Sequence, residues 1–234
     1  MCRDCGCSLP GASHTRAEES HEIEVNRRVL ERLDAIAAEN RRWLKQRNVV
    51  AVNLISSPGS GKTTLIEETL VRLGDRYRPA VIVGDQRTSF DAERLAKRCS
   101  RVVQIETSRS CHLDAQQVQR TLPQVVDGET RLLIIENVGN LVCPAAFDLG
   151  ERCKIALLSI TEGEDKPLKY PSLFMEAALT LITKTDLLPH LQWDVGACRR
   201  NLLRMNPDSQ AIEVSAQSGA GMATWIEFLD ALVG

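Results

Sequence analysis

A segment rich in glycine and hydroxyl residues, at positions 56–64, is the part of the sequence best suited to bind an anion. It reads Ser-Ser-Pro-Gly-Ser-Gly-Lys-Thr-Thr, follows an apolar run at residues 49–57 and precedes a helical run at residues 65–73. This order of strand, loop and helix aims backbone N–H groups and the positive end of a helix at one phosphate group. The segment therefore predicts a phosphate-binding loop.

The residue types within this loop suggest separate roles. Gly59 and Gly61 supply a permissive backbone, Lys62 can reach the β- and γ-phosphates of a nucleotide, and the Thr63 hydroxyl can ligate Mg²⁺. The strict pattern G-x-x-x-x-G-K-S/T has glycine at the position of Ser56, so this chain departs from it there. The nucleotide-contacting residues expected from this loop are Gly59, Ser60, Gly61, Lys62, Thr63 and Thr64.

An acid at the end of a later strand should hold the magnesium ion or its water. The apolar run at residues 131–136 ends in Glu136, and Gly139 follows where its N–H could meet a γ-phosphate. A solvated carboxylate at the strand end is the alternative for Glu136. Asp85 and Asp91 could orient the attacking water, although Asp91 could equally cap a helix. We expect a catalytic set of Lys62, Asp85 and Glu136, with Thr63 and Glu136 as the magnesium ligands.

The sequence Thr-Lys-Thr-Asp at residues 183–186 resembles the N-K-x-D element of GTP-binding domains. The Asp186 carboxylate can accept two hydrogen bonds from the N1–H and N2–H₂ groups of guanine, which adenine does not present together. Thr183 replaces the usual Asn, which predicts an altered brace of the loop and weaker base selectivity. Ser215 and Ala216 resemble the final loop that closes over the base, and Lys184 belongs to the same expected nucleotide site.

Two groups of soft donors could bind a metal ion. Cys2, Cys5 and Cys7 place three thiolates within reach of one ion. If the initiator Met is removed, the Cys2 amine completes a set of one nitrogen and three sulfurs. Square-planar coordination would suit Ni(II), whereas tetrahedral thiolates would suit Zn(II), and thiols without a ligand are the alternative. The second group comprises Cys111, His112 and Cys143, for which a structural cysteine and a surface histidine are the alternative.

The elements that must position these residues can be inferred from apolar periodicity. Apolar residues recur every three to four positions over residues 18–47, which predicts an amphipathic helix. Short apolar runs then alternate with helical stretches, which predicts an α/β fold with a mostly parallel sheet flanked by helices. We expect a flexible cysteine tail at 1–14, a helical segment at 15–47 and a phosphate-loop domain at 48–234. The predicted strands are 49–57, 80–84, 101–106, 131–136, 154–161, 178–184 and 211–214.

Composition excludes several other classes of protein. The 234 residues carry 29 Lys+Arg against 31 Asp+Glu, a net charge of −2, which argues against nucleic-acid binding through phosphates. No apolar run approaches the roughly 18 residues that cross a bilayer, so we expect no membrane span. The N-terminal segment carries charge and cysteines where a secretory signal would be apolar, so we expect a cytoplasmic protein with reduced thiols.

Taken together, the motifs resemble the hydrogenase nickel-incorporation GTPase family, the HypB family, over nearly the whole chain. The resemblance implies GTP hydrolysis by a dimerising GTPase of the P-loop NTPase fold, a nickel site in the tail, and a nickel or zinc site at Cys111, His112 and Cys143. It also implies a homodimer, a zinc-containing partner chaperone and the hydrogenase large subunit as the client. The matching segments are 2–7, 56–64, 84–95, 111–115, 136–151 and 161–174.

Two other functions remain open at this stage. One is a metal-delivery module whose nucleotide site is vestigial. The other is a related GTPase metallochaperone for urease or a cobalamin enzyme, although the cysteine tail and the sequence Cys-Pro-Ala at residues 143–145 favour hydrogenase.

Overall fold

Strands and helices alternate along the chain in the computed structural model, which describes residues 16–85, 89–107 and 110–234. The strands are β1 (Val50–Ser56), β2 (Ala80–Asp85), β3 (Val102–Glu106), β4 (Leu132–Glu136), β5 (Cys153–Ser159), β6 (Leu179–Thr183) and β7 (Gln210–Glu213). The α-helices are α1 (Arg16–Gln46), α2 (Lys62–Leu73), α3 (Phe90–Ala96), α4 (Ala115–Val125), α5 (Lys166–Lys169), α6 (Pro171–Glu176), α7 (Val195–Met205) and α8 (Met222–Val233). Two 3₁₀ helices, η1 (Cys143–Ala146) and η2 (Thr185–His190), complete the set found in these residues.

The described strands form one parallel sheet in the order β3-β2-β4-β1-β5-β6-β7. The central strand, β1, pairs with β4 on one side and β5 on the other. After β1 the chain forms β2 and β3 at one end of the sheet and returns to place β4 between β2 and β1. Strands β5, β6 and β7 then extend the sheet on the other side of β1. The predicted fold, a mostly parallel sheet flanked by helices, is therefore confirmed.

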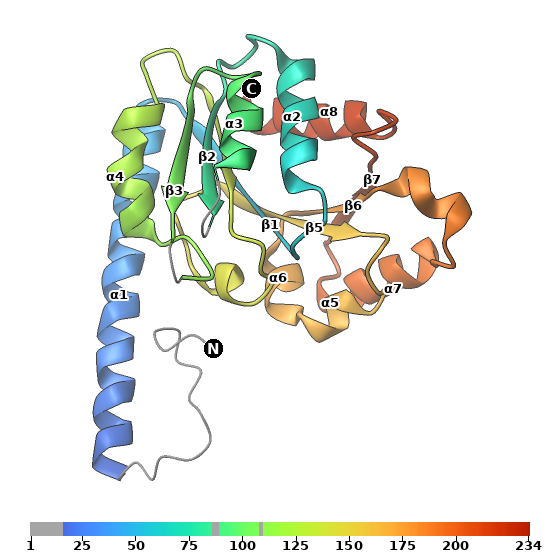
Figure 1. The fold of residues 1–234 in the computed structure, drawn as a ribbon. Coiled ribbons are helices and arrows are strands. Elements are labelled where there is room, and N and C mark those ends of the chain that lie inside the picture. The colour runs from blue at the N-terminus through green and yellow to red at the C-terminus, as the bar shows by residue number, and fades with distance from the viewer. Residues whose placement is uncertain (1–15, 86–88, 108–109) are drawn as a thin grey trace.

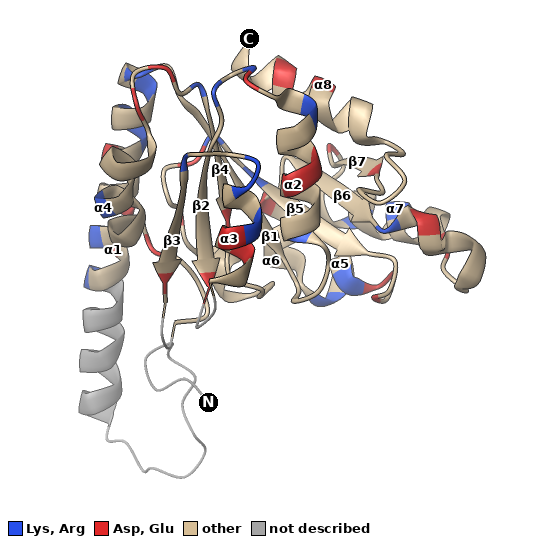
Figure 2. Cartoon of the chain, turned by 45° about the horizontal axis from the view of Figure 1, so that its top comes forward, with Lys and Arg blue, Asp and Glu red and all other residues tan. Residues whose placement is uncertain are grey.

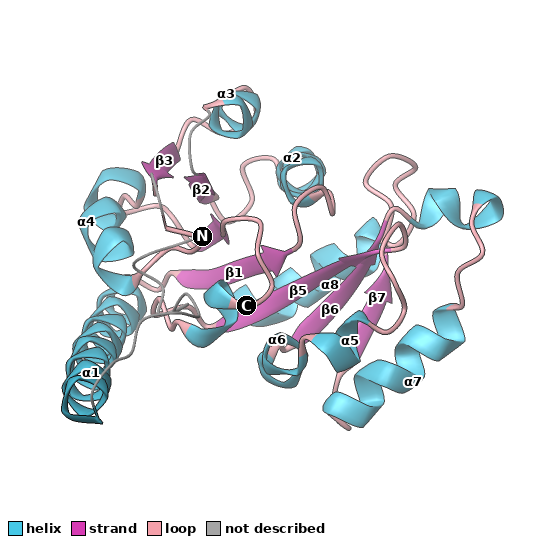
Figure 3. Ribbon diagram, turned by 60° about the horizontal axis from the view of Figure 1, so that its bottom comes forward, coloured by secondary structure: helices cyan, strands magenta, loops and turns pink. Residues whose placement is uncertain are grey.

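Helices cover both faces of the sheet (Figure 1). Residues of α2, α3 and α8 share one core cluster with one face of the strands. On the opposite face, α4 and the end of α1 pack over β1, β2 and β4, whereas α6 and α7 pack over β5 and β6. Figure 3 shows α1 beside α4 at one side of the molecule and the group of α5, α6 and α7 at the other.

Strand β1 shows why these apolar runs form buried strands. Successive side chains alternate between faces, so Val52 and Leu54 enter one core cluster, while Ala51 and Ile55 enter clusters on the other face. Every residue from Ala51 to Ser56 is buried. A strand with helices on both faces needs this continuous apolar pattern rather than an alternating one.

Helix α1 joins the domain through its C-terminal part. Ala37, Asn40 and Leu44 are buried, and their spacing of three and four residues places them on one side of the helix, toward α4. The predicted helix over residues 18–47 is confirmed, with observed bounds of Arg16–Gln46. The predicted tail at residues 1–14 lies outside the described residues. Among the helices that the structure describes, none combines the length and apolarity needed to cross a membrane.

The carboxyl ends of the parallel strands all lie at one edge of the sheet. Strands β2, β3 and β4 lie on one side of β1, and strands β5, β6 and β7 lie on the other. In open α/β sheets this edge is where ligands bind. Figure 2 shows acidic residues at the carboxyl ends of β2 and β3. The segment 56–64 leaves β1 at the same edge, so the fold brings the anion-binding loop and the strand-end acids together.

Candidate functional site

The loop between β1 and α2 has the backbone geometry that wraps an anion. Gly59 and Gly61 have φ of 74° and 96°, in the left-handed region that glycine tolerates and other residues rarely adopt. Gly61 is the N-cap of α2, and Lys62 is the first residue of that helix. The helix therefore directs its positive N-terminal end, with its unpaired N–H groups, toward the loop.

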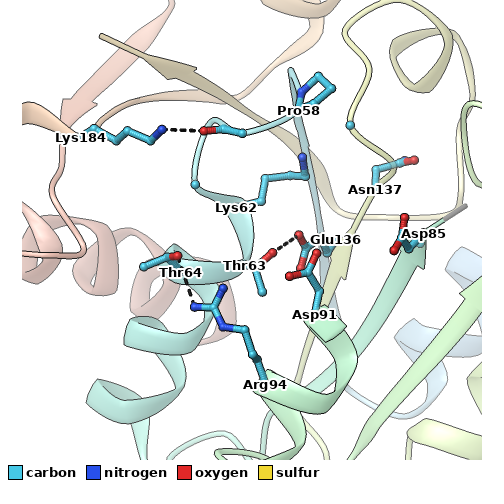
Figure 4. Close-up of a pocket in the computed structure, with 14 residues that line it drawn as sticks. Pro58, Lys62, Thr63, Thr64, Asp85, Asp91, Arg94, Glu136, Asn137 and Lys184 are labelled. Atoms are coloured by element: carbon cyan, nitrogen blue, oxygen red, sulfur yellow. Dashed lines mark hydrogen bonds between the residues drawn. The ribbon is translucent and has the colours of Figure 1, made fainter. Parts of the chain in front are cut away.

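A cavity of about 460 Å³ opens in front of this loop. It collects residues from the ends of β2 and β4, from α3 and from the loop that follows β6. Figure 4 shows Lys62, Thr63 and Glu136 near its centre, with Asp85 and Asp91 on one side and Lys184 on the other. The lining residues are Pro58, Gly59, Gly61, Lys62, Thr63, Thr64, Gly84, Asp85, Asp91, Arg94, Glu136, Asn137, Gly139 and Lys184.

Lys62 is buried and points along the loop toward the end of β1. Its Nζ donates a hydrogen bond to Ser56 Oγ at 2.8 Å, and Ser60 Oγ also bonds to Ser56 Oγ. Burial lowers the pKa of Lys62, while the nearby Glu136 carboxylate opposes that shift. Ser56, which departs from the strict loop pattern, thus accepts a hydrogen bond from the ammonium group. The sequence analysis missed this role of Ser56.

The side chains of Thr63 and Glu136 form a candidate magnesium site. Thr63 Oγ1 donates to Glu136 Oε1 at 2.7 Å, and the other carboxylate oxygen is buried without a hydrogen-bond partner among the described residues. Burial raises the pKa of Glu136 to about 7, although Lys62 and the Thr63 hydroxyl both lower it. A hydroxyl and a carboxylate side by side, with one oxygen still unpaired, fit a hard cation such as Mg²⁺.

Two further carboxylates line the same cavity. Asp85 ends β2, and Asp91 lies in the first turn of α3. The alternative that Asp91 caps a helix is wrong, because the N-cap of α3 is Ser89. Arg94, one turn after Asp91, also lines the cavity and pairs with Glu67 at 2.8 Å. No sequence motif marks Arg94 as part of the site.

Gly139 brings the segment after β4 against the phosphate loop. A Cβ atom on Gly139 would lie 3.1 Å from Pro58 Cα, so a larger residue would push the two segments apart. The segment that follows Glu136 thus contacts the loop where the terminal phosphate of a nucleotide is expected.

A second cavity, of about 230 Å³, adjoins the first and shares Gly61, Thr64 and Lys184 with it. Lys184 adopts φ of 62°, and its Nζ donates to the Gly59 carbonyl at 2.6 Å. Asp186 Oδ1 accepts a 2.5 Å hydrogen bond from the buried Ser215 hydroxyl. The cavity is lined by Ser60, Gly61, Thr64, Leu65, Thr183, Lys184, Asp186, Leu187, Val214, Ala216 and Gln217.

Thr183 takes the bracing position that the sequence comparison with N-K-x-D assigned to Asn. Its side chain is buried, and Oγ1 donates to the Ser60 carbonyl at 2.7 Å. The altered brace is therefore a hydroxyl that still bonds the phosphate loop. Its effect on base selectivity stays a prediction.

Cys111, His112 and Cys143, here called the cysteine–histidine group, are brought together from distant parts of the chain. One ligand atom from each lies within 4.8 Å of the others. The His112 ring stacks on Phe147 with centroids 3.8 Å apart, and burial lowers the pKa of His112. A neutral imidazole beside two thiols is a donor set that Ni(II) and Zn(II) accept. This grouping fits the metal-site prediction better than the alternative of a structural cysteine and a surface histidine, and binding of an ion stays a prediction.

The tail cysteines, Cys2, Cys5 and Cys7, lie outside the described residues. The five cysteines that the structure does describe form no disulfide. Cys99 and Cys198 are buried core residues, as is common for small sulfur side chains.

The nucleotide-binding domain model named CobW/HypB/UreG matches residues 50–213. A relative from Azotobacter chroococcum mcd 1, named hydrogenase maturation factor HypB, is 51% identical over 94% of this chain and 71% of its own. The chain belongs to the HypB branch of the CobW/HypB/UreG family.

Solved structures of HypB proteins share the fold. The crystal structure of hydrogenase maturation factor HypB from Archaeoglobus fulgidus has a TM-score of 0.82 and 36% identity, over 88% of this chain and all of that chain. The crystal structure of HypB from Helicobacter pylori in complex with nickel also has a TM-score of 0.82, with 34% identity, over 86% of this chain and 95% of that chain. The family-model match at residues 50–213 spans the phosphate loop, the end of β4 and the cysteine–histidine group.

Proposed function

We propose that the protein hydrolyses GTP to GDP and phosphate and uses this cycle to deliver nickel to the large subunit of [NiFe]-hydrogenase. One observation carries the proposal: a single segment connects the two sites. Glu136 and Gly139 line the nucleotide cavity, and Cys143 of the cysteine–histidine group follows four residues after Gly139. A movement of this segment at the terminal phosphate would therefore reach a metal ligand.

For hydrolysis, the chain mainly positions the phosphates and neutralises their charge. The loop Gly59–Thr64 would cradle the phosphates through backbone N–H groups, and Lys62 would exchange Ser56 for phosphate oxygens. Thr63 and Glu136 would hold Mg²⁺, which supplies charge neutralisation at the phosphates when bound. Asp85 is placed to orient the attacking water.

The second cavity would take the base. Asp186 is the acceptor for the N1–H and N2–H₂ groups of guanine, and Ser215 fixes its carboxylate in place. Lys184 spans both cavities, and Ala216 lines the side that closes over the base. This set of contacts favours GTP over ATP.

Nickel is the cargo in this proposal. Cys2, Cys5 and Cys7 would form the high-affinity nickel site, and the cysteine–histidine group would bind nickel or zinc. The relatives named hydrogenase maturation factors support hydrogenase as the client. We further propose that GTP closes a homodimer, that a zinc-containing partner chaperone receives the nickel, and that the thiols require the reducing cytoplasm.

The decisive test is the variant Lys62→Ala, with the exposed Lys97→Ala as the matched control. Loss of the buried ammonium group should reduce multiple-turnover phosphate release from GTP and Mg²⁺ by about 10²- to 10³-fold. Binding of Ni(II) by the tail should persist, and the variant should fail to restore hydrogenase activity in cells that lack the wild-type chain. Equal hydrolysis by Lys62→Ala and the wild type would refute the role assigned to Lys62. No turnover above buffer in the wild type would instead leave only a metal-delivery module with a vestigial nucleotide site.

A further inference from the structure

The two segments that carry the cysteine–histidine group meet at one buried residue of α1. Asn40 is 1% exposed, and its Nδ2 donates hydrogen bonds to the carbonyls of Ala115 at 2.8 Å and Leu149 at 3.0 Å. Ala115 begins α4, three residues after His112. Leu149 lies two residues after Phe147, the ring that stacks on His112. One amide group thus ties together both halves of the metal site.

A second path joins the same two segments from inside the sheet. Asn137 Oδ1 accepts from the backbone N–H of Leu113 at 3.2 Å, and its Nδ2 donates to Asn53 Oδ1 at 3.2 Å. Asn53 Nδ2 donates to Glu151 Oε1 at 3.1 Å, and Glu151 Oε2 accepts from the Leu149 N–H at 2.7 Å. All three side chains in this path are buried.

The two paths close into one structure, here called the buried ring: Asn40, the 113–115 backbone, Asn137, Asn53, Glu151 and Leu149. Buried amides and carboxylates with several partners are costly to misplace, because each lost hydrogen bond leaves a desolvated polar group. The ring therefore has one favoured arrangement. This arrangement sets the distance between the segment at residues 111–113 and the segment at residues 143–149.

The turn at residues 148–151 is fitted closely to α1. Gly150 has φ of 93°, and a Cβ atom there would lie 2.6 Å from Asn40 Cβ and 2.7 Å from the Ala37 carbonyl. Arg41 adds two hydrogen bonds of 2.7 Å to Asp148. Figure 1 shows α1 alongside α4, the helix that begins just after the first half of the metal site. The helix that follows the cysteine tail in the sequence thus docks on the segments next to the cysteine–histidine group.

We propose that Asn40 and Asn137 are positioning residues for the metal ion of the cysteine–histidine group, acting through the buried ring. Neither side chain is a metal ligand. Each holds a backbone segment so that the two thiols and the imidazole stay within reach of one ion. This inference rests on the metal site of the proposed function. Through Asn40 and Asn137, α1 and the residue after β4 would help to determine the metal affinity.

The test uses the full chain with Cys2→Ala, Cys5→Ala and Cys7→Ala, so that only the cysteine–histidine group reports on metal. Ni(II) and Co(II) are titrated into this parent and into the parent with Asn40→Ala. Loss of an outer-shell partner should weaken Ni(II) binding by about 10- to 100-fold and alter the visible spectrum of bound Co(II). A merely structural role would not change the Co(II) spectrum.

The matched control is Gln119→Ala. Gln119 Nε2 donates to Glu39 Oε2 at 2.9 Å, so it also joins α4 to α1, through a hydrogen bond that involves neither metal-bearing segment. This variant should bind Ni(II) as the parent does. Folded Asn40→Ala protein with unchanged affinity and spectrum would overturn the ring proposal alone, whereas a parent that binds no metal would overturn it together with the proposed domain metal site.

A second measurement needs no variant of the ring, in case Asn40→Ala does not fold. Amide hydrogen exchange is followed in the parent with and without Zn(II). Because metal binding and the buried ring should favour the same closed arrangement, exchange at the Leu113 and Leu149 amides should slow when Zn(II) binds. Unchanged exchange at both amides in the zinc-bound protein would contradict the proposal.

Discussion

The buried carboxylate of Glu136 is suited to a metal site, and its charge destabilises the folded protein unless a cation is bound there. The side chain is 4% exposed, and its environment raises the pKa to about 7 from an ordinary value of 4.5. Burial is the largest cause, and Lys62 and Thr63 compensate only in part. A group in this state costs free energy when it is charged and gains a partner when a cation arrives.

The sign of the resulting pH dependence follows from proton binding. Glu136 has a pKa of about 7 in the folded state and an ordinary value of 4.5 in the unfolded state. Between these two pKa values the folded state keeps a proton on Glu136 that the unfolded state releases. Raising the pH through this window therefore destabilises the folded protein, free of metal and nucleotide, by on the order of 3 kcal/mol. Below this pH window Glu136 is protonated in both the folded and the unfolded state. Above the window it is charged in both states, and the folded state bears the full cost of the buried charge.

Replacing this carboxylate by an uncharged amide should remove that penalty. In EDTA, Glu136→Gln should have a free energy of unfolding close to that of the wild type at about pH 5, and a higher one at about pH 8.5. Urea unfolding at the two pH values measures the difference. The exposed Glu129→Gln should retain the decline of the wild type, and a Glu136→Gln curve parallel to the wild-type curve would show that the carboxylate titrates normally.

Strand β6 and the phosphate loop are joined by a contact between distant parts of the sequence. Thr183 Oγ1 donates to the Ser60 carbonyl, across 123 positions of the chain. The contact anchors the loop to the strand that leads to the base-binding residues. Phosphate and base sites are thereby held at a fixed separation, which binding of a whole nucleotide requires.

The nearly isosteric variant Thr183→Val should loosen this brace. Loss of the buried hydrogen bond should cost about 1 kcal/mol of stability and leave the Ser60 carbonyl unsatisfied. We expect GDP to dissociate roughly fivefold faster, measured by displacement of a fluorescent GDP analogue. Thr180→Val is the matched control, since Thr180 is buried in the same strand and its hydroxyl has no hydrogen-bond partner in the part of the chain that the structure describes. Equal GDP release from the two variants would argue against the brace.

Some determinants of these elements lie close together in the sequence, whereas others are contacts between distant residues. Apolar periodicity and the glycine-rich loop act over neighbouring residues, so they predicted the strands, the parallel sheet and the place of Lys62 and Thr63. The hydrogen bonds from Asn40 to Ala115 and Leu149, and from Asn53 to Glu151, span 75, 109 and 98 positions, and no local pattern encodes them. Polar residues inside apolar runs, such as Asn53 in β1, were the available signal.

At the scale of the whole molecule, both halves of the cysteine–histidine group connect to the nucleotide cavity. Cys143 follows Gly139 along the chain, and Gly139 touches the phosphate loop at Pro58. Cys111 and His112 precede Leu113, whose N–H bonds to Asn137, the neighbour of Glu136. Two routes of contact therefore lead from one site to the other, and a change in the segment after Glu136 would be felt at both sites.

Coupling of this kind predicts that nucleotide state changes metal affinity. With the tail cysteines replaced by alanine, Ni(II) affinity should differ by about fivefold or more between the protein with GDP and the protein with a non-hydrolysable GTP analogue. By linkage, Ni(II) must then change the ratio of affinities for the two nucleotides by the same factor. Calorimetric titrations in both orders measure the two factors independently, with Cys143→Ala removing the metal response and Cys153→Ala preserving it. If Ni(II) binds equally well in both nucleotide states, the two sites act separately, and hydrolysis cannot be what releases the metal from this group.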